Sequence, residues 1–200
     1  MEGPLCSGTG PGRADHPSAA KKCRVGPRFL RRSLPLTAQP NVNGVVPPDP
    51  NGTVGPNHIV TMVNLTFQIF DKSGNSLLGP TNNNTLWAGF GGDCQTDNSG
   101  DPVVLYDRAA DRWLLSQFTA SGPTFFQCVA VSTTNDPTGS YFRYAISTGN
   151  NFPDYPKAGV WPDAYYFSTR EFLNTADRLR VPAPMRSIAL RRSPAIPTRR

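Results

Sequence analysis

Short apolar runs separated by turn residues are the feature that most limits how this chain can fold. Between residues 41 and 172 these runs are only a few residues long, rich in Val, Ile and aromatic residues, and bounded by Asp, Asn, Gly and Pro. Such runs are typical of β-strands, because a strand needs few residues whereas a helix needs a longer stripe with a 3.6-residue period. No long window of this region carries a helical stripe. The sequence therefore predicts an all-β fold of antiparallel hairpins.

The turn residues indicate where the hairpins lie. Residues 58–70 form one β-branched and aromatic run that ends at the turn-rich residues 71–75. The sequence Asp136-Pro-Thr-Gly139 supplies a fixed φ and a permissive glycine, as a tight connection requires. The expected strands are 58–70, 102–107, 111–118, 125–132, 140–146, 156–161 and 164–168.

The paired-hairpin spacing favours a β-propeller over a sandwich or a barrel. The innermost strands of a propeller are buried on both faces, which fits the unbroken apolar run 103–106. At about 40 to 45 residues per blade, residues 41–172 provide about three blades, whereas closed propellers have about 4 to 8. The expected fold is therefore a partial β-propeller of about three blades, with disordered basic ends.

The positive charge of the chain sits at its two ends. The net charge is +6, yet residues 1–40 and 171–200 each hold seven Lys or Arg against two acids, and residues 41–170 hold six against ten. No basic helix and no RNP-like aromatic pattern accompanies this charge, so we expect no nucleic-acid partner. The longest apolar stretches fall far short of the roughly 20 residues of a membrane-spanning helix.

The ends also change in character relative to the patterned region. The pattern stops near Phe172, and the first residues show no positive n-region followed by an apolar h-region, so no secretory signal can be read there. Residues 1–40 and 173–200 are interpreted either as basic segments foreign to this domain, as a shifted reading frame would produce, or as native disordered extensions. Under the first interpretation residues 41–172 are a propeller fragment.

Three segments carry a resemblance to a known family. Residues 100–118, 136–141 and 155–166 resemble parts of uncharacterised secreted bacterial proteins with a sialidase-like β-propeller domain. The resemblance extends over about residues 44–172. It implies a secreted or cell-surface location for the parent protein, and it carries no established activity.

Two of the four cysteines lie within the patterned region. Cys94 and Cys128 are 34 positions apart, and each lies beside a strand or loop that could bring the two together. A disulfide, which fits an oxidising compartment, and two buried free thiols are the alternatives. We expect no zinc site, because the chain has no CxxC pair.

The loop of residues 93–101 concentrates oxygen ligands. It carries Asp93, Asp97, Asn98 and Asp101, and hard oxygen donors of this kind suit calcium. The spacing does not match an EF-hand loop and lacks its closing Glu. The alternative is that these side chains cap the turns of their own backbone. Calcium is the one cofactor that the sequence suggests.

Carboxylates provide the case for an enzyme. Asp101 and Asp163 are the candidates for a general acid and base of a glycoside hydrolase of sialidase-like propeller type. However, the Ser-x-Asp-x-Gly-x-Thr-Trp turn motif of sialidases is absent. A Ser-His-Asp hydrolase fits less well still, because His58 is the single histidine of the patterned region and no Gly-x-Ser-x-Gly occurs.

Aromatic residues provide the case for a binding protein. Trp161, Tyr165 and Tyr166 offer flat apolar faces for a glycan or another cell-surface ligand. The alternative is that these rings fill the space between blades. The expected function is that of a carbohydrate or surface-ligand binding module, or of a fragment with no function of its own, with the glycoside hydrolase second and a purely structural repeat region third.

Overall fold

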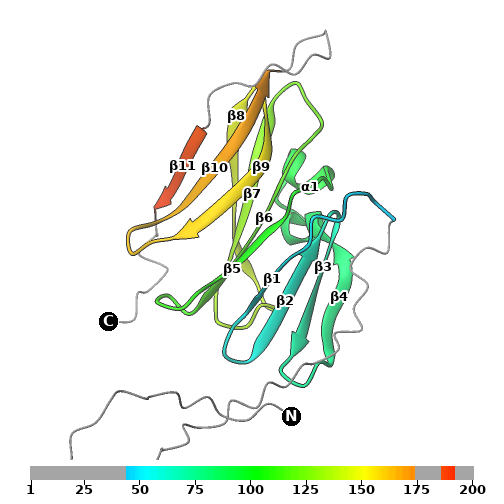
Figure 1. Ribbon diagram of the computed structural model, residues 1–200, viewed down its shortest axis with the longest axis vertical. Helices are drawn as coiled ribbons and strands as arrows, with labels where there is room; N and C mark the ends of the chain where they lie inside the picture. Colours follow the sequence, from blue (N-terminus) through cyan, green and yellow to red (C-terminus); the bar gives the residue numbers. More distant parts are fainter. Residues whose placement is uncertain (1–43, 174–185, 192–200) are drawn as a thin grey trace, which may run out of the picture. The chain divides into compact units, whose positions relative to one another are not determined.

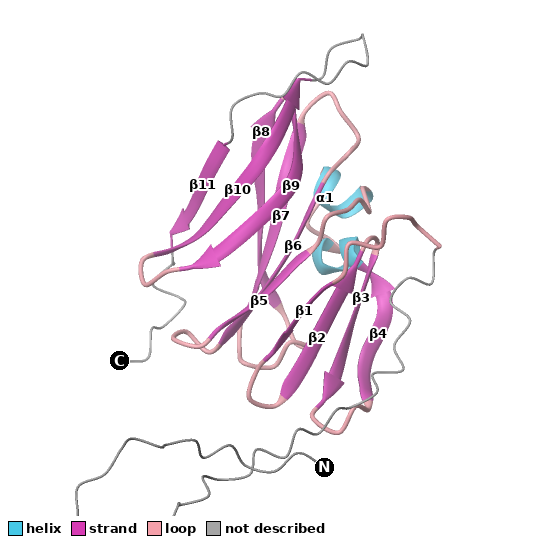
Figure 2. Ribbon diagram, in the orientation of Figure 1, coloured by secondary structure: helices cyan, strands magenta, loops and turns pink. Residues whose placement is uncertain are grey.

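Three antiparallel sheets make up the part of the chain that the computed structural model describes, residues 44–173 and 186–191 (Figures 1 and 2). The first two sheets have four strands and the third has three, and in each sheet the strands lie in the order in which the chain forms them. The expectation of an all-β chain of antiparallel hairpins is confirmed. Residues 1–40 and most of 174–200, for which we expected disordered or non-native ends, lie outside the described residues.

The first sheet contains β1 (Asn51–Val54), β2 (His58–Val63), β3 (Thr66–Asp71) and β4 (Ser76–Asn82). Our prediction of one strand over 58–70 is wrong, because the chain turns within this run and Val63 pairs with Thr66. Leu65 takes the positive φ of 79° that the turn requires, and the Asn64 amide donates to the carbonyl of Pro48 at 2.8 Å. The sequence does not indicate this turn, because a positive φ is normally supplied by glycine and Leu65 is an apolar residue.

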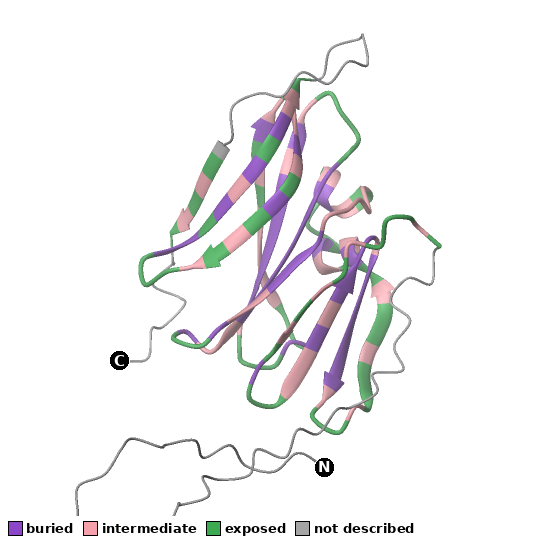
Figure 3. Ribbon diagram, in the orientation of Figure 1, coloured by how far each residue is buried: buried purple, intermediate pink, exposed green. Residues whose placement is uncertain are grey.

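The second sheet contains β5 (Val103–Asp107), β6 (Arg112–Phe118), β7 (Phe125–Ser132) and β8 (Tyr141–Gly149). The four strands expected here are confirmed. Strands β6 and β7 are buried along almost their whole length (Figure 3). Both of their faces are covered, so these strands bury polar side chains such as Ser116, Gln117 and Gln127 together with their apolar residues.

The third sheet contains β9 (Asn151–Val160), β10 (Ala164–Leu173) and β11 (Arg186–Arg191). The strand β11 lies within 173–200, for which we expected a disordered or non-native tail, and it pairs with β10 over six residues. Its alternation explains the pairing: Ile188 and Leu190 pack against the core, while Ser187 and Ala189 are exposed. Two hydrophobic residues were too few to distinguish this segment from its basic surroundings.

Two short helices follow the first sheet, η1 (Asn83–Trp87) and α1 (Asp93–Thr96). The disulfide between Cys94 and Cys128 joins α1 to β7, with the two Cα atoms 5.7 Å apart, and the predicted pairing is confirmed. Both cysteines are buried together with Trp87. Neither helix, nor any other helix within the described ranges, has the length and apolarity needed to cross a bilayer.

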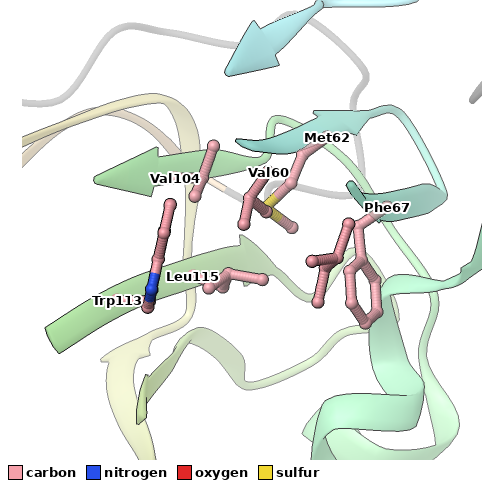
Figure 4. Close-up of a cluster of buried hydrophobic side chains, with 7 residues drawn as sticks. Val60, Met62, Phe67, Val104, Trp113 and Leu115 are labelled. Carbon is pink, nitrogen blue, oxygen red and sulfur yellow. The ribbon is translucent and has the colours of Figure 1, made fainter. Parts of the chain in front are cut away.

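The core lies between neighbouring sheets. One cluster packs Val60, Met62 and Phe67 of the first sheet against Trp113 and Leu115 of the second (Figure 4). A second cluster packs the second sheet against the third. The opening strands of the sheets are also in contact, β1 with β5 and β5 with β9, and the Val104 amide donates to Asn51 Oδ1 at 3.1 Å.

Candidate functional site

The outer face of the third sheet, which points away from the core, carries the exposed aromatic residues. Side chains alternate between the two faces of a strand, and the positions facing away from the core are exposed or half-buried, apart from the buried Ala164. We use the term outer face for Lys157, Gly159, Trp161, Tyr166, Ser168, Ser187, Ala189 and Arg191. The inner face carries Ala158, Val160, Tyr165, Phe167, Ile188 and Leu190, which all belong to the core.

Trp161 and Tyr166 are the two large rings of the outer face. Their side chains are 66% and 41% exposed. The Trp161 amide donates to the carbonyl of Ala164 at 3.0 Å, so Trp161 stands opposite Ala164 and diagonal to Tyr166. Diagonal neighbours on one face are about 7 to 8 Å apart, within reach of aromatic side chains. The two rings therefore form one exposed aromatic surface.

Small residues flank Tyr166 and leave the sides of its ring open. In the register of the sheet, Tyr166 lies between Gly159 of β9 and Ala189 of β11. A Cβ atom placed on Gly159 would have no neighbour within 4 Å. A flat ligand could therefore approach the Tyr166 ring without displacing any side chain at the Gly159 position.

Polar groups border the two rings. The Tyr166 hydroxyl donates to Asp163 Oδ2 at 2.8 Å, and this hydrogen bond raises the pKa of Tyr166. The charge of Arg191 opposes this shift in pKa, so Arg191 also acts on the ring's hydroxyl. The ammonium of Lys157 lies 3.6 Å from the centre of the Tyr155 ring, and the Tyr155 side chain is 62% exposed. Aromatic faces and hydrogen-bonding groups are thus interleaved on this surface.

Tyr165 does not belong to this surface, which corrects its prediction as a ligand-binding residue. Its side chain is fully buried in the core, and its hydroxyl donates to Asp107 Oδ2 at 2.9 Å. The reason is the alternation of β10, which turns Tyr165 inward because its neighbour Tyr166 points outward. The sequence did not indicate which of the two adjacent tyrosines would face solvent.

Hydrogen bonds already occupy side-chain oxygens of Asp97 and Asn98, two of the oxygen ligands of the 93–101 loop. Asp97 Oδ2 accepts hydrogen bonds from the amides of Ala120 and Ser121 at 2.7 and 2.8 Å, and Asp97 Oδ1 accepts one from the Ser99 hydroxyl. Asn98 accepts from the Asn84 amide, and Asp93 opens α1. Among the residues that the structure describes, no three His, Cys, Asp or Glu side chains are placed to hold a metal ion.

Asp101 and Asp163, the predicted acid and base, do not form a pair. Asp101 Oδ2 accepts a hydrogen bond from the Tyr155 amide at 3.1 Å, whereas Asp163 lies in the turn after β9. Tyr155 and Trp161 are separated by roughly 20 Å of strand at about 3.3 Å per residue. Glycoside hydrolases place their two carboxyl groups about 5 to 9.5 Å apart.

Asp101 has other carboxylates in its surroundings. Burial raises its pKa, and the negative charges of Asp49 and Asp154 raise it further. These three residues come from the beginnings of the three sheets: Asp49 precedes β1, Asp101 precedes β5, and Asp154 lies early in β9. The arrangement concentrates negative charge where the sheets begin.

A cleft of about 750 Å³ lies between the first and second sheets, and we call it the β4–β8 cleft. No sequence pattern predicted this cleft, because its walls come from segments far apart in the chain. The one local signal was the Asp136-Pro-Thr-Gly139 turn, which forms part of the rim. The cleft is lined by Phe67, Leu78, Gly79, Pro80, Thr81, Thr85, Leu86, Ala88, Pro137, Thr138, Gly139, Ser140, Tyr141 and Arg143.

A smaller cleft of about 570 Å³ lies at the turns of the first two sheets. Lys72 and Arg108 supply two positive charges to its lining, and Asp111 supplies a negative one. The Tyr106 hydroxyl donates to Asp111 Oδ1, so this carboxylate is already used within the protein.

Comparisons with protein-family models, with curated proteins and with solved structures find no match to this chain. The resemblance to secreted proteins with a sialidase-like propeller stays a prediction.

Proposed function

We propose that this chain is a carbohydrate-binding module of a secreted β-propeller protein, and that Trp161 and Tyr166 contact the sugar. The observation that carries the proposal is the placement of two exposed rings at diagonal positions on one face of a sheet, next to polar side chains. Protein sites for small ligands combine apolar or aromatic faces with a few placed polar groups. The outer face has this composition.

The contacts between opening strands support the propeller interpretation. In a propeller the innermost strands of successive blades lie side by side around a common axis. The contacts of β1 with β5 and of β5 with β9 follow this order. Each sheet then corresponds to one blade, about three in all. The Cys94–Cys128 disulfide supports a secreted protein, because such bonds persist in oxidising compartments.

The composition of the outer face favours a ligand over a further packed sheet. The inner face, which is buried against a sheet, carries apolar and aromatic residues such as Val160 and Phe167. The outer face instead carries Lys157, Arg191 and serine hydroxyls around its two rings. Burying these charges without partners would cost several kcal/mol. A bound sugar would leave the charges of Lys157 and Arg191 in contact with water or would form hydrogen bonds with them.

A pyranose ring fits the two kinds of group on this surface. Its C–H face would stack on the Trp161 indole, which supplies a flat apolar area at little cost in conformational entropy. Its hydroxyl groups would exchange hydrogen bonds with the carboxylate of Asp163 and the guanidinium of Arg191. Such a site would bind without cleaving, since Asp101, the other candidate carboxylate, does not pair with Asp163.

Titration of the full chain with sugars tests the proposal. A glycan array would identify the sugar class, and calorimetry with the selected oligosaccharide would compare the wild type with Trp161→Ala and Tyr166→Ala. Each ring should contribute roughly two- to tenfold to the affinity, since a stacked aromatic contact provides about 0.5 to 1.5 kcal/mol beyond the area it buries. Leu77→Ala is the matched control, because Leu77 is 48% exposed on a different sheet.

The outcomes separate the functions. Binding that is weakened in Trp161→Ala, kept in Leu77→Ala and accompanied by no turnover of chromogenic glycosides supports the module. Turnover abolished by Asp163→Asn would instead establish the hydrolase. Absence of glycan binding by a wild-type chain whose thermal unfolding is cooperative would refute the proposal.

A further inference from the structure

Among the described residues that line the β4–β8 cleft, one has a charged side chain. Arg143 projects from β8, and every other lining residue is apolar, a glycine, a hydroxyl-bearing residue or an alanine. With a volume of about 750 Å³ the cleft is within the range of sites that enclose small ligands. It lies at β4 and β8, the last strands of their sheets, and shares no residue with the outer face.

Contacts with the protein hold Arg143 in place but use little of its binding capacity. Its Nη1 donates to the carbonyl of Ala88 at 2.7 Å, and its guanidinium carbon lies 5.6 Å from the centre of the Phe90 ring. A guanidinium has five N–H donors. Within residues 44–173 and 186–191 no carboxylate forms an ion pair with Arg143. The half-buried cation therefore lacks a counter-charge in the described structure.

Apart from Thr81, the hydroxyl groups in the described lining of the cleft already have hydrogen-bond partners. Thr85 donates to the carbonyl of Asn82 at 2.6 Å, and Thr138 donates to Asp136 Oδ1 at 2.7 Å. The Tyr141 hydroxyl donates to the carbonyl of Pro137, and burial raises the pKa of Tyr141 far above its usual value, so the ring stays neutral. Arg143 is consequently the main free donor that faces the cleft.

The remaining walls are apolar. Phe67, Leu78 and Leu86 line one side, and Pro80 and Pro137 lie in the lining as well. A ligand that complements this cleft needs one anionic group that pairs with Arg143 and an apolar body that packs against the walls. A sugar, with hydroxyl groups on every side, would leave its own polar groups unpaired here.

We propose that the β4–β8 cleft binds a small organic acid, with its carboxylate on the Arg143 guanidinium and its apolar body against Phe67, Leu78 and Leu86. The planar guanidinium matches the geometry of a carboxylate, with which it forms paired N–H···O bonds. The Ala88 carbonyl and the Phe90 ring hold the guanidinium in advance, so little conformational entropy is lost on binding. This site is separate from the sugar surface and does not depend on it.

The first test changes the ligand and leaves the protein intact. The full chain is titrated with 3-phenylpropionate and with its neutral amide, 3-phenylpropanamide, by calorimetry or by NMR chemical-shift mapping. The acid should show saturable binding, and the amide should bind at least tenfold more weakly. Equal affinities, or no saturation by the acid at tens of millimolar, would overturn the proposal.

The second test changes the protein. Arg143→Gln should weaken binding of the acid at least tenfold and leave the amide unaffected, while Arg143→Lys should give an intermediate affinity because it keeps the charge but loses the planar fork. Arg170→Gln is the control, since Arg170 is exposed on the third sheet. Trp161→Ala should leave this affinity unchanged. An acid affinity unaltered in Arg143→Gln would place the ligand elsewhere.

Discussion

The hydroxyl of Tyr165 donates a hydrogen bond of 2.9 Å to Oδ2 of Asp107, and both side chains are buried. The bond joins β10 of the third sheet to the end of β5 in the second. Asp107 Oδ1 meanwhile accepts from the amides of Ala109 and Ala110, each at 3.0 Å. One carboxylate thus shapes the β5–β6 turn and connects two sheets.

Tyr165→Phe is expected to lower the free energy of unfolding by about 2 kcal/mol. The change removes a buried hydrogen bond to a carboxylate, and hydrogen bonds of this kind contribute about 1.5 to 3 kcal/mol. Urea unfolding of the two proteins measures the difference. Tyr166→Phe is the matched control, because the neighbouring Tyr166 is exposed and its hydroxyl bonds to a solvent-exposed Asp163. Equal losses in the two variants would contradict the structural role of Tyr165.

The Cys94–Cys128 disulfide should contribute about 4 kcal/mol to stability. It closes a loop with a sequence separation of 34, and the chain-entropy relation gives about this value for such a loop. The double variant Cys94→Ala, Cys128→Ala should therefore unfold at a lower urea concentration than the oxidised wild type. The reduced wild type should resemble the variant. If oxidised and reduced wild type unfolded at the same concentration, the bond would contribute nothing.

Substitution of Gly55 tests the packing between the first and second sheets. A Cβ atom on Gly55 would lie 2.5 Å from Cζ2 of Trp113, which is fully buried. Gly55→Ala should therefore destabilise the protein by about 1 to 3 kcal/mol, the usual cost of overpacking.

The control for this substitution is Gly159→Ala. Gly159 has no neighbour within 4 Å of its Cβ position and lies in a strand, so the added methyl group should be neutral or stabilise by up to about 1 kcal/mol. Thermal unfolding of both variants provides the comparison. An unchanged midpoint in Gly55→Ala would mean that Trp113 does not pack against this turn.

The sequence predicted those strands whose boundaries are marked by turn residues. The Asp107–Asp111 and Asp136–Gly139 connections carry Asp, Pro or Gly, and the flanking strands were predicted close to their observed bounds. The turn at Leu65 was missed, because a leucine with positive φ leaves no compositional mark. Local chemistry predicts a turn only where the turn itself needs a special residue.

The sites were less predictable than the strands, because they depend on which segments meet. Trp161 and Tyr166 were identified as aromatic candidates, but the separation of Tyr165 from Tyr166 needed the register of β10 against β9. Arg143 was no more than one of several arginines in the sequence. Arg143 differs from the other arginines because it lines the β4–β8 cleft. This cleft is formed by β4, η1 and β8 together, so no single segment of the sequence indicates it.

The surroundings of Asp101 predict how stability varies with pH. Burial raises the pKa of Asp101 above its ordinary value of 3.8, and the charges of Asp49 and Asp154 add to the shift. The unfolded chain therefore releases this proton at a lower pH than the folded protein does. Protonated Asp101 therefore contributes in full to the free energy of unfolding at pH values below its ordinary pKa. This contribution is lost as the pH rises through the folded-state pKa of Asp101.

Asp101→Asn should remove this loss of stability. The variant keeps an oxygen that can accept the hydrogen bond of the Tyr155 amide but carries no charge. Urea unfolding of both proteins from pH 3.5 to 7 should show the variant gaining stability relative to the wild type as the pH increases. Asp136→Asn should show the opposite trend, because hydrogen bonds from Thr138 lower the pKa of Asp136. A parallel pH dependence of the wild type and Asp101→Asn would show that Asp101 ionises as freely in the folded protein as in the unfolded chain, and the carboxylates at the beginnings of the three sheets would then exert no measurable repulsion.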